Sequence, residues 1–119
     1  MKIEKQTVGD VVVLTFAGEF DAFGDASVLE EIDGLIEGST RAVFNFRDLT
    51  FISSSALGYL LKAVKTLRDA GGDLVYSEPA QSFRRIIDVY GVAEVFRVFA
   101  SDHAALAHFE RYGAGEKTH

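Results

Sequence analysis

Two hydrophobic periodicities alternate along this chain, and the alternation limits the folds available to it more than any other feature. The β-branched run from Val11 to Ala17 follows a weaker extended segment, Lys2 to Thr7, across the turn Val8 to Asp10. This arrangement predicts an opening β-hairpin. Beyond it, stripes with helical spacing and short apolar runs follow one another, and strands that alternate with helices form parallel sheets through right-handed crossovers. The sequence therefore predicts an α/β domain with a mixed sheet and helices packed on it.

The segment from Ser54 to Ala70 has the clearest helical pattern. Its leucine and valine side chains recur at i, i+3, i+4, i+7 and i+10 from Leu57, and Gly71 and Gly72 provide a stop signal. The other predicted elements are a helix at Asp25 to Ile36, a strand at Arg41 to Phe46 followed by a polar turn through Arg47 and Asp48, a strand at Leu74 to Tyr76, a helix from Phe83 to near Gly91, a strand at Val95 to Phe99, and a helix to Tyr112 with Ser101 or Asp102 as its N-cap.

Length and composition allow one domain. The chain has 119 residues and no cysteine, so neither a disulfide nor a thiolate metal site is expected. We expect a single domain over residues 1–112 and a flexible, polar, glycine-bearing tail over residues 113–119. The first residues lack the apolar core of a secretory signal, and no apolar run approaches the roughly 20 residues that span a bilayer. A cytoplasmic protein without a transmembrane segment is therefore expected.

Charge and motif content argue against nucleic-acid binding and against catalysis. Acidic residues outnumber basic ones by 18 to 12, and the net charge of −6 disfavours direct contact with nucleic acid. His103 and His108 do not have the i, i+4 spacing that places two metal-binding histidines on one helical face. The glycine-rich phosphate-binding loop and the Gly-x-Ser-x-Gly nucleophile motif are both missing from the sequence. We therefore expect a protein that is not an enzyme and needs no cofactor or metal.

Three serines, Ser53 to Ser55, directly precede the strongest predicted helix. Loops that follow parallel strands meet at one edge of a sheet, and we expect Gly18 to Gly24, Arg47 to Ser55 and Ser77 to Ala80 at that edge. The first turn of a helix has unpaired N–H groups and the positive end of the helix dipole. One serine there can simply cap the helix, and a phosphate on such a serine would also be held. The residues alone leave both interpretations open.

Several segments resemble the STAS domains of anti-sigma factor antagonists. The stretch Leu49 to Gly58, Leu-Thr-Phe-Ile-Ser-Ser-Ser-Ala-Leu-Gly, resembles the family signature, in which an apolar pair precedes Asp-Ser-Ser/Thr-Gly-Leu-Gly. Gly18 to Asp21 resembles the family's Gly-Glu-Leu-Asp after the second strand. Phe44 to Phe46 resembles its central strand, and Ala70 to Leu74 resembles the end of its second helix and the next strand. The likeness covers most of the chain and implies a STAS fold.

The resemblance implies that the protein acts by partner switching. In the family, the unmodified antagonist binds an anti-sigma factor that is also an ATP-dependent serine kinase. Phosphorylation of one serine of the antagonist releases it from the anti-sigma factor, and a PP2C-type phosphatase removes the phosphate. The serine at the corresponding position here is Ser54. Ser53 stands where the family has Asp, and Ala56 stands where it has Gly. Ser55 as the acceptor and a permanently unmodified protein are the alternatives.

The resemblance also implies a partner interface at the predicted functional edge. The expected partner-binding residues are Asp21, Phe23 and Gly24 on the first loop, Ser53, Ser54 and Ser55 on the second, and Gly58, Tyr59 and Lys62 on the outward face of the second helix. Structural roles are the alternatives for three of them. Asp21 could cap the first helix, Phe23 could belong to the core, and Tyr59 could be an isolated exposed aromatic.

Three other functions stay open at this point. A phospho-receiver domain would place its acceptor near Asp48, but the acidic pair after the first strand and the lysine after the last strand are missing. A STAS-type module that binds a small ligand or nucleotide would need a deep pocket at the functional edge. A STAS-like subunit of a transport or signalling assembly would act without phosphorylation, and it would purify as a stable hetero-oligomer.

Overall fold

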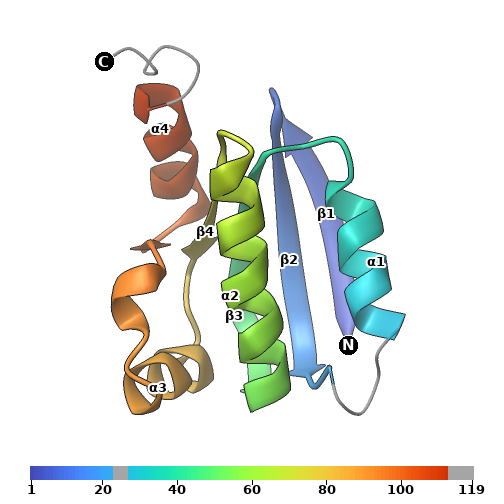
Figure 1. The fold of residues 1–119 in the computed structure, drawn as a ribbon, viewed down its shortest axis with the longest axis vertical. Helices are drawn as coiled ribbons and strands as arrows, with labels where there is room; N and C mark the ends of the chain where they lie inside the picture. Colours follow the sequence, from blue (N-terminus) through green and yellow to red (C-terminus); the bar gives the residue numbers. More distant parts are fainter. Residues whose placement is uncertain (23–26, 113–119) are drawn as a thin grey trace.

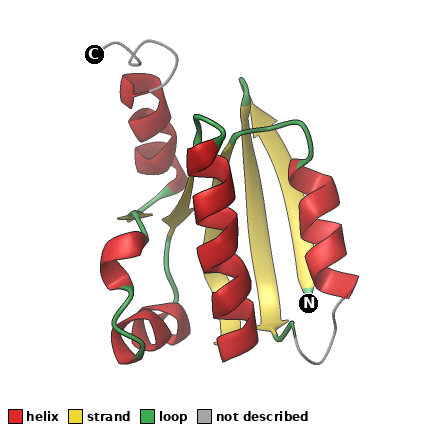
Figure 2. Cartoon of the chain, viewed as in Figure 1, coloured by secondary structure: helices red, strands yellow, loops and turns green. Residues whose placement is uncertain are grey.

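The computed structural model describes residues 1–22 and 27–112, and within these residues it has one five-stranded sheet and four α-helices (Figure 1, Figure 2). In chain order the elements are β1 (Lys2–Val8), β2 (Val11–Phe20), α1 (Ser27–Ile36), β3 (Arg41–Ile52), α2 (Ser54–Asp69), β4 (Asp73–Ser77), α3 (Gln81–Val89), the short 3₁₀ helix η1 (Ala93–Val95), β5 (Val98–Phe99) and α4 (Asp102–Tyr112). The predicted α/β class is confirmed.

The strands of the sheet follow the order of the chain, β1-β2-β3-β4-β5. β1 is antiparallel to β2, with Val8 opposite Val11, and the left-handed backbone of Gly9 (φ 63°) permits the tight turn between them. The remaining pairs of neighbouring strands are parallel. The opening hairpin is thus confirmed, and each parallel strand is reached through a crossover that contains a helix.

Helices pack on both faces of the sheet. α1, α2 and α3 cover the face that carries the large core, and α4 covers the other face with a smaller cluster (Figure 1). Side chains alternate between the two faces along each strand. On β2, Leu14 and Phe16 belong to the large core, whereas Val11 and Val13 pack in the smaller cluster, where they join Phe109 of α4.

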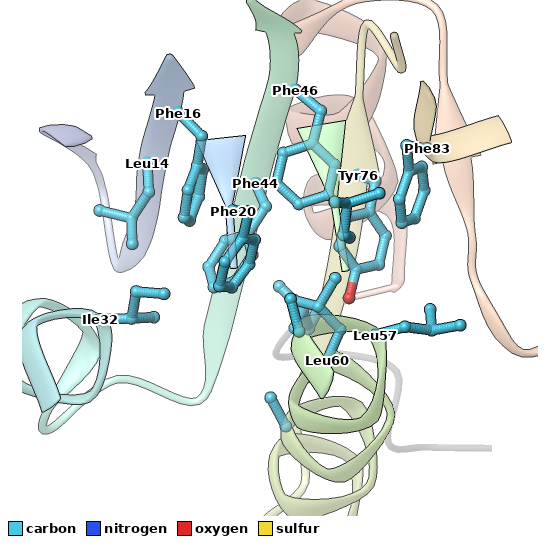
Figure 3. Close-up of a cluster of buried hydrophobic side chains, with 14 of the residues drawn as sticks. Leu14, Phe16, Phe20, Ile32, Phe44, Phe46, Leu57, Leu60, Tyr76 and Phe83 are labelled. Atoms are coloured by element: carbon cyan, nitrogen blue, oxygen red, sulfur yellow. The ribbon is translucent and has the colours of Figure 1, made fainter. Parts of the chain in front are cut away.

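Aromatic rings fill the large core (Figure 3). Phe16, Phe44, Phe46 and Tyr76 are fully buried, and their rings lie close, with centroids 4.9 Å apart for Phe16 and Phe44 and 5.4 Å apart for Phe46 and Tyr76. The hydroxyl of Tyr76 is buried without a hydrogen-bond partner among the described residues. The apolar stripe of α2 packs against these rings, so the opposite face of that helix points to solvent.

β3 corrects one prediction, because Arg47 and Asp48 do not form a turn. The strand runs on to Ile52, since β2 also continues to Phe20 and pairs with it there. Both charged residues are exposed, and the backbone N–H of Arg47 donates to the side-chain oxygen of Asn45 at 2.9 Å. Two irregularities in the β2–β3 register accommodate the longer pairing. The predicted loop before α2 is therefore reduced to Ser53.

The other boundaries need smaller corrections. The last strand is Val98–Phe99 instead of Val95 to Phe99, because residues 93–95 form a 3₁₀ turn. Of the two N-caps predicted for α4, Ser101 is the one observed, since its Oγ accepts a hydrogen bond from the N–H of Ala104 at 3.1 Å. The predicted start of the first helix, Asp25, and the predicted tail, residues 113–119, lie outside the described residues.

Candidate functional site

α2 begins at a turn made of three serines. Ser53 is the N-cap residue: its backbone is extended (φ −87°, ψ 165°), and its Oγ accepts a hydrogen bond from the N–H of Ala56 at 3.1 Å. The same Oγ lies 3.0 Å from Oγ of Ser55, close enough for a second hydrogen bond. The capping role expected of one serine therefore falls to Ser53, which leaves Ser54 outside this network.

Ser54 presents its hydroxyl at the solvent-exposed start of α2. The residue is exposed, and its side chain makes no hydrogen bond to any described residue. The first turn of α2 contains no acidic side chain. The unpaired N–H groups of this turn and the helix dipole therefore meet no competing carboxylate within α2, which is a setting that can hold an added phosphate.

The serine turn lies against the end of β2. The N–H of Ser53 donates to the carbonyl of Phe20 at 3.0 Å, and Phe20 pairs with Ile52 in the sheet. Asp21 follows directly and is half-buried, so it lies at the same carboxyl edge of the sheet as the serines. Two further residues predicted here, Phe23 and Gly24, lie outside the described residues.

The exposed face of α2 continues from the serine turn. Gly58 and Lys62 follow Ser54 at i+4 and i+8, and both are exposed. A Cβ on Gly58 would meet no atom within 4 Å, so the helix backbone is bare at this point. The predicted set of Ser54, Gly58 and Lys62 is therefore brought together on one helical face.

Tyr59 is half-buried and differs from the isolated exposed aromatic that the sequence allowed. Its ring lies edge-on to Phe20, with centroids 6.4 Å apart, and its hydroxyl donates to Oδ1 of Asp33 at 2.7 Å. Burial, this hydrogen bond and the charge of Asp33 raise the pKa of Tyr59 well above the ordinary value. Tyr59 therefore connects α2 to α1 as a neutral phenol.

Sequence reasoning missed the exposed aromatic residue nearest to the serines, Phe51. Its exposed fraction is 47%, whereas its neighbour Ile52 is buried. A signal for this was present, because consecutive residues of a strand point to opposite faces and only one of the pair can enter the core. Val89 and Tyr90, at the end of α3, are also exposed and were likewise not singled out.

A polar cavity of about 450 Å³ lies at the opposite, amino end of the parallel strands, lined in part by Arg41, Arg97 and His108. Its buried carboxylate, Asp73, is already paired: Oδ1 accepts a hydrogen bond from Nε of Arg68 at 2.7 Å, and Oδ2 pairs with Arg97. This cluster therefore connects α2, β4 and the segment before β5. Among the described residues, no group of three or more His, Asp or Glu could hold a metal ion.

Within residues 1–22 and 27–112, no helix combines the length and the hydrophobicity needed to cross a membrane.

Two curated proteins are similar over most of the sequence. The chain is 23% identical over 112 residues to the anti-sigma F factor antagonist of Paenibacillus polymyxa, which covers 92% of this chain and 96% of that protein. It is 22% identical over 102 residues to the anti-sigma-B factor antagonist of Bacillus subtilis, covering 86% of this chain and 93% of that protein.

Solved structures of SpoIIAA, an anti-sigma factor antagonist, have the same fold. The unphosphorylated form matches with a TM-score of 0.75 at 21% identity, covering 92% of this chain and 97% of that chain. The phosphorylated form of the Bacillus protein matches with a TM-score of 0.68 at 22% identity, covering 90% and 98%. The family model described as the STAS domain matches residues 2–105, from the opening hairpin through the serine turn and into α4. The chain therefore belongs to the STAS domain family.

Proposed function

We propose that this protein is a cytoplasmic anti-sigma factor antagonist, itself without catalytic activity, that binds an anti-sigma factor while Ser54 is unmodified. Phosphorylation of Ser54 by that factor, acting as an ATP-dependent serine kinase, releases the protein, and a PP2C-type phosphatase restores it. The observation that carries the proposal is the exposed Ser54, whose hydroxyl makes no hydrogen bond to a described residue while Ser53 caps the helix. The roles of the two curated relatives and the existence of SpoIIAA in two phosphorylation states support it.

The interface of this proposal is the carboxyl edge of the sheet together with the exposed face of α2. Asp21 and the three serines contribute its edge, and Phe23 and Gly24, which lie outside the described residues, are its further predicted members. Gly58 and Lys62 contribute the helical face, and the bare backbone at Gly58 allows a partner to approach closely. Tyr59 holds this face in position through its hydrogen bond to Asp33.

The switch requires only a local change of charge. A phosphate on Ser54 adds about −1.5 to −2 charges to a surface that binds as a neutral hydroxyl. Desolvation and like-charge repulsion of about 3 kcal/mol would weaken binding on the order of 100-fold. The first turn of α2 can hold the phosphate through its N–H groups, so the fold itself does not need to rearrange.

Titration calorimetry with purified ATP-binding anti-sigma factors encoded in the same genome tests this function. We expect one of them to bind the wild type and Ser54→Ala with the same affinity, and Ser54→Asp about 10- to 100-fold more weakly because the added charge reduces binding. After incubation with that factor and Mg-ATP, mass spectrometry should find phosphate on Ser54 in the wild type and in the control Ser55→Ala, but none in Ser54→Ala. Equal binding by all variants, or phosphate on Ser55, would contradict the proposal.

A further inference from the structure

A groove lies beside the serine turn because β3 extends past the end of β4. Residues Arg41 to Asn45 of β3 pair with Asp73 to Ser77 of β4, so among the described residues the rest of β3 pairs with β2 alone. α3 runs along the other side of this segment, where Oγ of Ser82 donates to the carbonyl of Leu49 at 3.2 Å. The helix does not fill the space, and a groove of about 320 Å³ remains between α3 and the end of β3.

The groove has an apolar lining that reaches solvent. Its apolar lining includes Phe51 of β3 and Ile86 and Val89 of α3. The exposed fraction is 47% for Phe51 and 73% for Val89, and Tyr90 beside it is 56% exposed. Phe51 and Val89 are two of the five large hydrophobic side chains exposed in the described part of the chain, and both line this groove. Two exposed apolar side chains on one groove provide a surface on which a partner can bury an apolar side chain of its own.

The groove also has a basic border on an otherwise acidic protein. Arg85 lines the groove and Arg84 is exposed next to it, whereas the whole chain has a net charge of −6. Neither arginine takes part in an ion pair within the described residues, and this includes Asp88, one turn after Arg84. A carboxylate of a binding protein at this border could therefore pair with an arginine that has no ion pair within the described residues.

The groove lies next to the serine turn along the chain. Phe51 is separated from Ser53 by a single residue, and α3 lies beside the end of α2 at which Ser54 begins the helix (Figure 1). We infer that the groove between β3 and α3 is a second part of the anti-sigma factor interface, and that it receives an apolar side chain of that factor flanked by a carboxylate. The apolar side chain lies between Phe51 and Val89, and the carboxylate pairs with Arg85. This inference rests on the proposed function.

The two parts of the interface have different physical roles. Ser54 carries the switch, since its charge changes with phosphorylation, whereas the groove carries affinity that is the same in both states. Aromatic and arginine side chains that become buried at the centre of an interface contribute disproportionately to binding, and the groove offers Phe51 and Arg85. In this proposal phosphorylation of Ser54 weakens binding at the serine turn, while the contribution of the groove to affinity stays the same.

The test uses the anti-sigma factor identified by the titrations above, purified alone. We expect Val89→Ser, and the double variant Phe51→Ser/Val89→Ser, to bind it at least 10-fold more weakly than the wild type. Arg85→Glu should weaken binding as well, and Arg85→Lys should retain most of it. Val8→Ser is the matched control, because Val8 is also an exposed aliphatic residue (40%) but lies at the end of β1, beside the hairpin turn and at the opposite end of β2. It should bind like the wild type.

The outcomes separate the two proposals. Wild-type affinity in the folded Val89→Ser variant, beside weak binding of Ser54→Asp, would overturn the groove inference and leave the proposed function intact. An equal loss in Val8→Ser would also overturn the inference, since the effect would not be specific to the groove. Sedimentation could instead show that the wild type is a dimer and Val89→Ser a monomer, with unchanged affinity for the factor. The occupant of the groove would then be a second copy of the chain, and the inference would be wrong. Failure of every anti-sigma factor to bind the wild type would remove both proposals.

Discussion

Ser53 and Ser55 share a hydrogen bond, but only Ser53 stabilises the helix by accepting from a backbone N–H. Removing an N-cap serine typically costs about 1 kcal/mol. We therefore expect Ser53→Ala to lower the free energy of unfolding by about 1 kcal/mol, as measured by urea denaturation followed by circular dichroism. Ser55→Ala is the control, and its loss should be under about 0.5 kcal/mol because its exposed hydroxyl bonds only another hydroxyl. Equal losses for both variants would show that the cap is not the stabilising contact.

Single residues also show where reading of the sequence reaches its limit. The serine triplet could be placed at a helix start, because the stripe that follows it sets the helix and its exposed face. Strand alternation indicates that only one of Phe51 and Ile52 enters the core, but whether the other is exposed or covered depends on where β4 ends and how far α3 covers β3. Those are tertiary facts, and local periodicity does not contain them.

At the level of elements, the connection from α2 to β4 depends on close contact between two backbones. A Cβ on Gly72 would overlap the carbonyl of Thr40, which also accepts the N–H of Asp73 at 2.9 Å. We expect Gly72→Ala to cost about 3 kcal/mol of unfolding free energy, because the backbone must shift. Gly34→Ala in α1 is the control: its Cβ would meet no atom within 4 Å, and alanine should stabilise that exposed helix by up to about 1 kcal/mol. Thermal unfolding of both variants measures the difference.

The bounds of an element were predictable where a long periodic stripe of apolar residues defines it, and less so where pairing with a neighbouring strand defines it. The 16 residues of α2 match their predicted range closely. β3 was underestimated because its charged pair, Arg47 and Asp48, looks like a turn until β2 is known to extend beside it. β5 was overestimated because its apolar residues are shared between a 3₁₀ turn and a two-residue strand.

For the whole molecule, alkaline pH should reveal the buried tyrosine. Burial raises the pKa of Tyr76 well above the ordinary value of 10.0, and its hydroxyl has no hydrogen-bond partner among the described residues. The unfolded chain loses this proton near pH 10 while the folded chain keeps it, so stability that is complete below pH 10 falls as the pH rises above it. The slope is about 1.4 kcal/mol per pH unit for one such group.

Urea unfolding between pH 7 and pH 11 measures this effect. Tyr76→Phe should be at least as stable as the wild type at pH 7, because it removes a buried hydroxyl without a partner. Its advantage should grow above pH 10, because only the wild type has the hydroxyl of residue 76 to ionise on unfolding. Tyr59 contributes in the same direction but less, since it is half-buried and its charge is partly screened by water. Parallel pH profiles for the two proteins would contradict the assignment.

The hydroxyl cap at Ser53 has a consequence for signalling. A carboxylate at that position would place one negative charge at the start of α2, where it would interact with the positive end of the helix dipole before any modification. With serine there, neither the cap nor the first turn of α2 has a negatively charged side chain before modification. Its first anion arrives only with the phosphate, as a single step of about two charges. The difference in charge at the serine turn between the unmodified and the phosphorylated protein is then as large as one serine can provide.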